Sequence, residues 1–338
     1  VSRGLGDVYK RQMLIDTDKD VILHNHAMSQ LLGHQIPQPR HSYLDDVKTY
    51  ALARMIEHTF RHEKTHHQEL TILTTQKSVD ASVIPLNQGI SRLQVLVILY
   101  DVTYLRQVEK MQLDFVGNVS HELKTPVTAI SGFAETLLGG AKNDPATLDR
   151  FLGIIYDESK RLTQLINDIL TLSRPDSNQN VAASVALKKL VDDALHNLAK
   201  VIQDKQIRVE VAITPDLLVV TDERKLTQIV RNLLNNAVFY NRLAGHVTIS
   251  AQVVDHQLSL AVADTGIGIS ETEQARIFER FYRVDKARSR HNGGTGLGLA
   301  IVAELVKSMD GHVAVHSQVG VGSTFTVTLP VGEGPHRG

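Results

Sequence analysis

Two long stretches of regularly spaced apolar residues constrain the fold of this chain more than any other feature. Between residues 105 and 138, apolar side chains recur at intervals of three and four, close to the heptad spacing of packed helices. The same spacing returns over residues 148–172, after a Gly139-Gly140 break and a helix start at Pro145. Two long helices with a short connection form an antiparallel helix hairpin. One hairpin cannot bury both apolar stripes, so the sequence predicts a dimeric four-helix bundle.

A histidine on the first of these helices is followed directly by a carboxylate. His121 precedes Glu122, and Thr125 lies one helical turn after His121. An imidazole, whose ordinary pKa is about 6.5, is largely neutral and nucleophilic at neutral pH, and an adjacent carboxylate can accept or orient its ring proton. Pro126 lacks an N–H, so we expect the helix to bend just past the site. Alone, a His-Glu pair on a helix is more often an exposed polar face.

Composition excludes several classes of protein. The 338 residues suit two or three domains, and a net charge of −1 gives no indication of nucleic-acid binding. There is no cysteine, which excludes disulfides and thiolate chemistry, and no apolar run approaches the roughly 18 residues of a membrane-spanning helix. Residues 1–12 resemble the translation of a sequencing-library adaptor, so we expect the natural reading frame to continue upstream of Met13.

After a polar linker at residues 176–180, strands and helices alternate up to about residue 331. Strands are predicted at residues 207–213, 247–254, 257–264, 312–317 and 323–329. Helices are predicted at residues 187–205, 223–241 and 297–309. Because these strands and helices cannot pair one to one, we expect an α+β sandwich with the helices on one face of the sheet.

Three separate pieces of this region carry groups suited to a nucleotide. Asn232 and Asn236 are one turn apart on a predicted helix, so their amide oxygens share a face as hard ligands for Mg²⁺. Tyr240 continues that face and offers a ring to a base. Asp264 ends a predicted strand, where it can accept from an exocyclic amine. The alternative for the asparagine helix is a polar N-cap or a solvated face.

Glycines complete the second and third pieces. Gly266 and Gly268 let the backbone approach a flat ring, and the glycine-rich loop at residues 293–298 leads into a helix whose N–H groups can hold phosphate oxygens. The loop is neither a Walker A motif nor a dinucleotide fingerprint. Each piece is weak alone, and the three in this order are strong.

These motifs together resemble a bacterial two-component sensor histidine kinase, and their details are closest to the phosphate-regulon sensor type (PhoR-like). The likeness covers residues 13 to about 330. The family's H, N, G1, F and G2 boxes correspond to residues 115–126, 232–240, 264–268, 277–283 and 294–299. The resemblance implies a dimerisation and phosphotransfer domain at residues 105–176, a GHKL-type ATP-binding domain at residues 182–332 and a tail at residues 333–338.

The resemblance also implies ATP and Mg²⁺ as cofactors. Asn236 would bind Mg²⁺ with Asn232 in support, Asp264 would recognise the adenine amine, and Tyr240 would line the base pocket. Residues 281–292 would form a lid over the phosphates. Its candidate phosphate contacts are Arg283, the best match to the family, and Lys286, Arg288 and Arg290. The full predicted nucleotide-binding set is Asn232, Asn236, Tyr240, Asp264, Gly266, Gly268, Arg283, Gly294, Thr295, Gly296, Leu297 and Gly298.

By the same resemblance, His121 would accept the γ-phosphoryl group of ATP with the help of Glu122. The group would pass to an aspartate of a separate response regulator, which Thr125 would help to dephosphorylate by positioning a water. Two alternatives compete: a gyrase- or chaperone-like ATP-driven machine, and a ligand sensor with a degenerate kinase. Only Phe239 favours the latter, because the family usually has a basic residue there and a cation near the phosphates is missing.

Residues 13–104 resemble an α/β PAS sensor domain, with short strands around an Asp-Lys-Asp turn, a terminal strand near residues 93–102, and helix from residue 43 onward. His58, His62 and His66 form a row on a predicted helix, with His67 adjacent; the row is either a metal or pH-sensing site or a solvated polar face. We expect this fragment to be cytoplasmic. The resemblance implies that upstream segments anchor the full-length protein in the plasma membrane.

Overall fold

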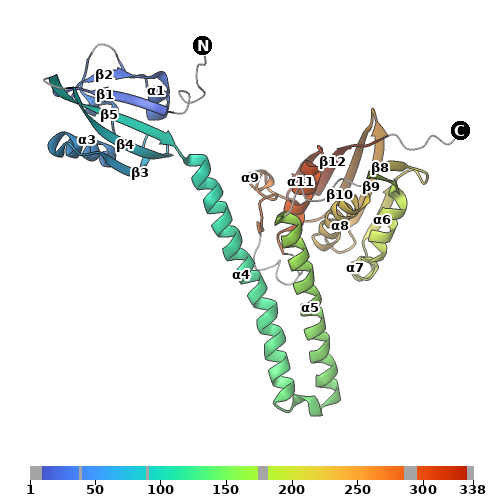
Figure 1. Ribbon diagram of the computed structural model, residues 1–338. Helices are drawn as coiled ribbons and strands as arrows, with labels where there is room; N and C mark the ends of the chain where they lie inside the picture. The colour runs from blue at the N-terminus through green and yellow to red at the C-terminus, as the bar shows by residue number, and fades with distance from the viewer. Residues whose placement is uncertain (1–9, 38–39, 89–90, 174–181, 285–294, 333–338) are drawn as a thin grey trace. The chain divides into compact units, whose positions relative to one another are not determined.

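The computed structural model describes residues 10–37, 40–88, 91–173, 182–284 and 295–332 (Figure 1). The chain divides into two compact units, residues 1–116 and residues 117–338, and each is considered by itself. The boundary falls inside one long helix, α4 (Thr103–Leu138).

The N-terminal domain is an antiparallel five-stranded sheet with three helices. Its strand order is β2-β1-β5-β4-β3. The strands are β1 (Lys10–Ile15), β2 (Val21–His24), β3 (His66–Ile72), β4 (Lys77–Gln88) and β5 (Ser91–Asp101). The helices are α1 (His26–Leu32), α2 (Tyr43–Asp46) and α3 (Tyr50–His62). Apolar side chains of α1 and α3 pack with alternate residues of β1, β4 and β5 in a single core.

Two expectations for this domain were wrong. The helical stretch predicted beyond residue 56 ends at His62, and strands β3 and β4 follow it. Every described strand pair is antiparallel, so the domain is α+β rather than α/β. The origin of residues 1–12 stays a prediction, and three of these residues, from Lys10 onward, pair with β5 as the start of strand β1.

The predicted helix hairpin is confirmed. It consists of α4, the short 3₁₀ turn η1 (Ala141–Asn143) and α5 (Pro145–Ser173). Asp144 begins α5, because its carboxylate accepts from the backbone N–H of Thr147 at 3.2 Å. Helix α4 continues through Pro126, so the proline does not end it.

Helix α5 carries two apolar faces. Leu165, Asp168 and Leu172 are buried on one face, and the two leucines join the core of the C-terminal domain. The opposite face is exposed although it carries large apolar side chains, at Leu152, Tyr156, Ile166 and Leu170. Only one of the two faces is therefore covered within the described chain.

The C-terminal domain has the predicted α+β sandwich. Its main sheet has the order β11-β12-β10-β9-β7, and a two-stranded sheet pairs β6 with β8. The strands are β6 (Ala182–Ala186), β7 (Arg208–Ala212), β8 (Leu218–Asp222), β9 (His246–Val254), β10 (Gln257–Asp264), β11 (His312–Gln318) and β12 (Gly322–Pro330). The helices are α6 (Leu187–His196), α7 (Ala199–Asp204), α8 (Glu223–Phe239), α9 (Glu271–Gln274) and α11 (Gly298–Ser308).

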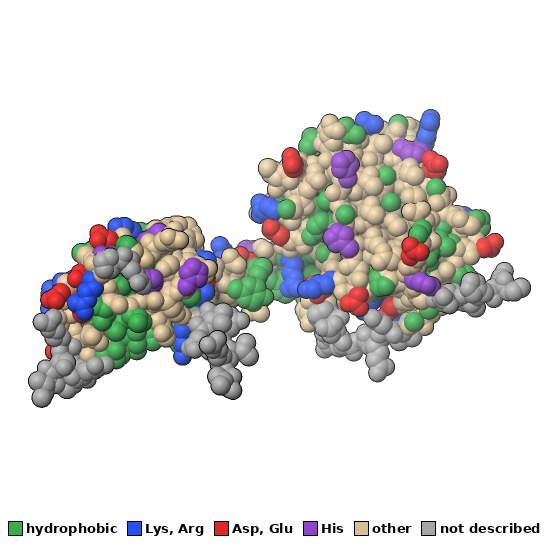
Figure 2. Space-filling view, turned by 90° about the horizontal axis from the view of Figure 1, so that it is seen from above, with side chains coloured by type: hydrophobic (Ala, Val, Ile, Leu, Met, Phe, Trp, Pro, Cys, Tyr) green, Lys and Arg blue, Asp and Glu red, His purple; other side chains and the backbone are tan. Residues whose placement is uncertain are grey.

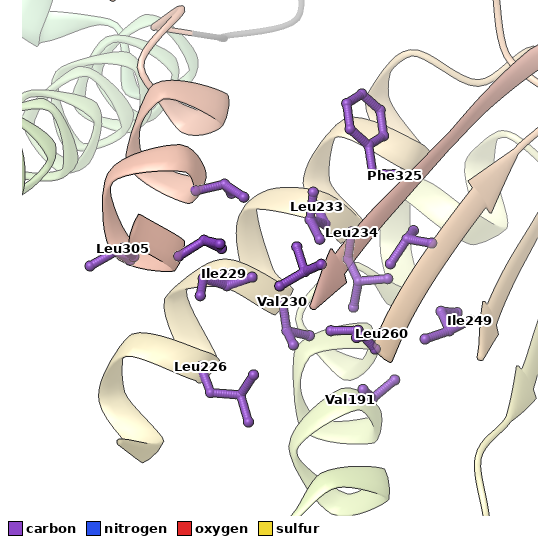
Figure 3. Close-up of a cluster of buried hydrophobic side chains, with 14 of the residues drawn as sticks. Val191, Leu226, Ile229, Val230, Leu233, Leu234, Ile249, Leu260, Leu305 and Phe325 are labelled. Carbon is purple, nitrogen blue, oxygen red and sulfur yellow. The ribbon is translucent and has the colours of Figure 1, made fainter. Parts of the chain in front are cut away.

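All five predicted strands of this domain are present, and the helices cover one face of the main sheet. Figure 3 shows the resulting core, with leucines and isoleucine of α8 between Leu305 of α11 and Leu260 of β10. The helix predicted at residues 187–205 is two helices, α6 and α7, and strands β6 and β8 were not predicted. This core fixes the ends of α8, β10 and α11, where the candidate site lies.

Candidate nucleotide site and phosphoacceptor histidine

His121 is exposed on α4. Glu122 beside it is half-buried, and Leu123 packs against the core of the C-terminal domain. The Thr125 hydroxyl donates to the backbone carbonyl of His121 at 3.3 Å, which places it one turn away on the same face. The imidazole is thus accessible to an incoming group, with the Thr125 hydroxyl one helical turn away and Glu122 next in sequence.

Helix α8 presents the two predicted asparagines. Asp222 starts the helix by accepting from the backbone N–H groups of Arg224 and Lys225 at 3.0 and 3.1 Å. Asn232 is 8% exposed, and its Nδ2 atom has no hydrogen-bond partner among the described residues. A buried amide without a partner is unfavourable unless something absent satisfies it. Asn236, one turn later, is half-buried on the same face.

The glycine-rich loop reaches this face of α8. A Cβ atom added at Gly298, the first residue of α11, would lie 3.7 Å from Oδ1 of Asn232. Leu297, just before it, is buried, and its backbone N–H donates to the Thr295 hydroxyl at 3.3 Å. The N-terminus of α11 therefore lies next to the Asn232 amide. A site for phosphates and their metal ion needs groups of both kinds close together.

Asp264 ends β10 in a half-buried position. Its Oδ1 atom accepts from the backbone N–H of Gly266 at 2.8 Å. Burial raises the pKa of Asp264, and the backbone hydrogen bonds from Gly266 and Ser323 lower it by less. A desolvated carboxylate at a strand end is a strong acceptor for an amine brought to it.

Three of the predicted glycines are needed for backbone reasons. A Cβ atom at Gly266 would lie 2.5 Å from the carbonyl oxygen of Tyr240, and one at Gly268 would lie 2.0 Å from that of Gln318. Gly268 and Gly296 also have positive φ, of 69° and 73°. Gly296 accepts a hydrogen bond from the backbone N–H of Phe281 at 2.9 Å, which joins the F and G2 segments.

Arg283 is partly buried, and its Nε and Nη2 atoms have no hydrogen-bond partner among the described residues. Guanidinium donors left without partners suit an anion such as phosphate. The unpartnered Nδ2 atom of Asn232 is also a donor, so these groups together fit the phosphates of a nucleotide, and the amide oxygens of Asn232 and Asn236 are of the kind that Mg²⁺ takes as ligands. Gly294, Lys286, Arg288 and Arg290 lie outside the described residues.

Two polar residues at this corner were not predicted. Asn241 is 7% exposed and hydrogen-bonds the Thr265 hydroxyl at 3.2 Å and the carbonyl of His246 at 3.0 Å. Lys205 contacts the end of α8. Asn241 follows the N box directly, which is a local signal, whereas the sequence gives no sign that Lys205 comes close.

The histidine row of the N-terminal domain is not on one helix. Helix α3 ends at His62 and His66 starts β3, yet the ring of His58 lies 4.2 Å from each of the other two rings, centroid to centroid. Burial and the nearby cations lower the pKa of His58. His67 instead pairs with Asp80, at 3.1 Å. No cluster of described histidine or acidic side chains in the chain is arranged to hold a metal ion.

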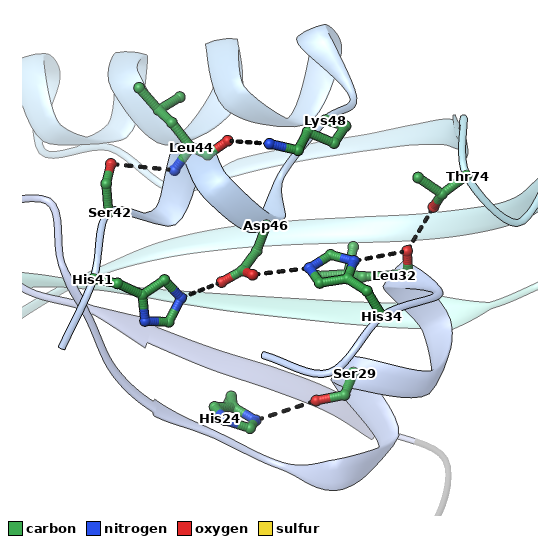
Figure 4. A network of polar contacts seen from close by, with 10 residues as sticks. All are labelled: His24, Ser29, Leu32, His34, His41, Ser42, Leu44, Asp46, Lys48 and Thr74. Carbon is green, nitrogen blue, oxygen red and sulfur yellow. Dashed lines mark hydrogen bonds and ion pairs between the residues drawn. The ribbon is translucent and has the colours of Figure 1, made fainter. Parts of the chain in front are cut away.

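A separate polar network lies beside α2 (Figure 4). Asp46 is 2% exposed, and its carboxylate accepts from Nε2 of His34 at 2.8 Å and of His41 at 2.6 Å. Both histidines precede α2, so the network fastens the connection between α1 and α2. On the face shown in Figure 2, acidic, basic and histidine side chains are interspersed.

Comparison with known families matches both structural parts of the second unit. The family described as histidine kinase-, DNA gyrase B- and HSP90-like ATPase matches residues 221–333. Because that family also includes gyrase- and HSP90-like ATPases, this match alone does not exclude the alternative of an ATP-driven machine. The His Kinase A (phospho-acceptor) domain matches residues 111–178, which include His121 and most of the hairpin. The chain belongs to the sensor histidine kinases.

Individual sensor histidine kinases agree with this. Sensor histidine kinase WalK of Bacillus subtilis is 33% identical over 96% of this chain, and sensor-like histidine kinase SenX3 of Mycolicibacterium smegmatis is 41% identical over 66%. The chain spans 54% and 59% of the lengths of these relatives. Full-length ShkA, solved in complex with AMPPNP, matches 65% of this chain and 46% of its own, at 28% identity and a TM-score of 0.51. Among the described residues, no helix is long and apolar enough to cross a membrane.

Proposed function

We propose that the chain is an ATP-dependent protein-histidine kinase that phosphorylates His121. The observation that carries the proposal is the pairing, in one compact unit, of an exposed histidine on a phosphoacceptor hairpin with a nucleotide-type site. A conformational ATPase would need the nucleotide-type site but not the exposed histidine on a phosphoacceptor hairpin.

The residues divide the reaction between them. Asp264 accepts from the adenine amine while Tyr240 lies against the base, and the N–H groups at the start of α11 hold phosphate oxygens with Arg283. Asn236 and Asn232 would hold Mg²⁺, which would supply positive charge next to the transferring phosphoryl group. A ring nitrogen of His121 attacks the γ-phosphorus, the bond to the β–γ bridging oxygen breaks, ADP leaves, and Glu122 takes the ring proton.

We propose two further reactions at the same turn of α4. Phosphohistidine passes its phosphoryl group to an aspartate of a separate response regulator, in agreement with the family. Thr125 then positions a water that hydrolyses the phosphorylated regulator. The place of its hydroxyl, one turn from His121, supports this second role.

The exposed apolar face of α5 supports a homodimer, because a second hairpin is the partner of matching length and pattern. The N-terminal domain is proposed to be a PAS-like sensor, which its antiparallel sheet and flanking helices suit. A phosphate-regulon role and membrane attachment of a longer protein stay predictions from the resemblance.

Labelling separates this function from its competitor. Incubation with ATP labelled at the γ-position should leave label on the protein itself. An ATP-driven machine would release labelled inorganic phosphate and leave the protein unlabelled.

A further inference from the structure

Lys205 reaches the end of helix α8 from the corner between α7 and β7. Its ammonium group donates to the backbone carbonyls of Phe239 at 2.6 Å, Val238 at 3.1 Å and Asn241 at 3.3 Å. Its own carbonyl accepts from the backbone N–H of Ala244 at 2.8 Å. A single residue therefore fastens both the last turn of α8 and the turn that follows it.

The contact answers a requirement of helix ends. The last carbonyls of a helix have no partner within the helix and carry the negative end of its dipole, so a cation there is favourable. The ammonium is partly buried, and its desolvation lowers the pKa of Lys205. Such a cost is tolerated where the contact replaces the lost hydration.

The same geometry excludes a direct role in phosphate binding. An ammonium group has three N–H donors and no acceptor. The three carbonyls match that number, so Lys205 has no donor left for a phosphate. It does not replace the cation missing at Phe239.

The turn that Lys205 holds carries part of the candidate base pocket. The carbonyl of Tyr240 accepts from the backbone N–H of Ile267 at 3.3 Å and lies against Gly266, where there is no room for a Cβ atom. Next to it, the Asn241 side chain bonds the Thr265 hydroxyl. A shift of this turn would move Tyr240 relative to Asp264 and its glycines.

We propose that Lys205 is a positioning residue for the nucleotide base, acting by fixing the turn that carries Tyr240 against the segment that follows Asp264. This inference rests on the proposed function of the site. It predicts that the loss of Lys205 weakens recognition of the adenine ring more than it weakens binding of the phosphates.

Two nucleotides and a small set of variants test the proposal in the full chain. Inosine triphosphate keeps the phosphates of ATP but lacks the exocyclic amine. The Kd for inosine triphosphate divided by the Kd for ATP therefore reports on recognition of the base. Lys205→Met should raise the Kd for ATP about tenfold and bring the ratio toward one. Lys205→Arg, which keeps the charge and the donors, should recover most of the affinity for ATP and most of the ratio. Lys200→Met, at an exposed lysine of α7, is the matched control and should change neither.

Four outcomes are decisive. The inference is overturned if Lys205→Met binds ATP as the parent does, or if it weakens both nucleotides equally, since the second result marks a purely structural role. If the methionine variant does not fold, Lys205→Gln, with two amide donors, is judged by the same criteria. Asp264→Asn distinguishes a failure of the proposed nucleotide site from a failure of the role of Lys205. If Asp264→Asn leaves the ratio unchanged, the proposed site is wrong. If Asp264→Asn lowers the ratio and Lys205→Met does not, only the role of Lys205 is wrong.

Discussion

At the scale of single residues, the proposed site combines an exposed histidine, as the nucleophile, with recognition groups that are buried or half-buried. His121 is accessible on α4, which suits a group that must meet both ATP and a partner protein. Asn232 is buried and Asp264 is half-buried, where each hydrogen bond to a ligand gains strength from the lower dielectric. Exposure thus separates the residue that is proposed to react from those that are proposed to recognise the nucleotide.

Thr125 should matter for dephosphorylation and not for phosphorylation. Thr125→Ala removes the hydroxyl next to His121, so we expect autophosphorylation close to that of the parent and a loss of regulator dephosphorylation of about tenfold or more. Thr136→Ala is the matched control, because Thr136 is exposed on the same helix and its hydroxyl also bonds the carbonyl four residues earlier, at 2.7 Å. Equal losses in both reactions would make Thr125 structural.

Asp264 should give nucleotide binding a pH dependence. The carboxylate is the better acceptor for the adenine amine, and burial raises the pKa of Asp264. Protonation therefore competes at higher pH than for an ordinary aspartate, and the affinity for ATP should fall as the pH falls through that raised pKa. Folding has the opposite sign, because a raised carboxyl pKa costs stability as the pH rises above the unfolded value of about 3.9.

Calorimetric titration with ATP at a series of pH values measures this effect. Asp264→Asn should bind more weakly and lack the Asp264 contribution, so the difference between the two profiles isolates the carboxyl group. Asp255→Asn, in the exposed β9–β10 turn, is the control. Parallel profiles for the parent and Asp264→Asn would contradict the assignment.

At the scale of elements, long periodic segments were predictable and short ones were not. The hairpin helices and the five main strands follow from apolar spacing, which local sequence carries directly. Strands β6 and β8 have five residues each and pair with one another far along the chain, so their stability comes from the partner. The histidine row has helical spacing, but Glu63 adopts a left-handed conformation that ends α3.

The same division holds within the site. The asparagine, aspartate and glycine positions could be proposed from the sequence because each belongs to a short local motif. Lys205 was not, since its contact with the end of α8 joins residues more than thirty positions apart and depends on the packing of α7 and β7. The burial of Asp168 on α5 is another tertiary effect that spacing alone does not reveal.

Gly268 should be the least replaceable glycine of the loop that follows β10. Gly268→Ala combines a positive φ with a Cβ atom 2.0 Å from the carbonyl of Gln318, and we expect it to lower the free energy of unfolding by about 3 kcal/mol. Gly320 has a similar φ, of 79°, but open space at the Cβ position, so Gly320→Ala should cost about 1 kcal/mol. Denaturant unfolding, followed in the transition that ATP stabilises, measures both. Equal costs would show that the close approach is relieved without strain.

At the scale of the whole molecule, helix α5 has one face in the core of the C-terminal domain and another face open for assembly. One face joins the core of the C-terminal domain through Leu165 and Leu172. The opposite face exposes Leu152 and Leu170, which lie about five helical turns apart on one line. A helix with two apolar faces and one covered is suited to assembly.

Leu152→Glu should therefore disrupt a homodimer. A charge placed on the exposed face opposes burial against a second hairpin, so light scattering should show about half the mass of the parent. Leu152→Met keeps the apolar character and should remain dimeric. A parent chain that is monomeric, or a glutamate variant that stays dimeric, would contradict the proposed assembly.

The central claim is that His121 takes the γ-phosphoryl group of ATP, and site-specific labelling tests it most directly. The parent chain, incubated with γ-labelled ATP, should carry label that acid removes and alkali does not, as expected for phosphohistidine. His121→Gln should bind ATP like the parent and carry no label, while His196→Gln, at an exposed histidine of α6, should be labelled normally. Label that persists in His121→Gln, or label that resists acid, would contradict the account.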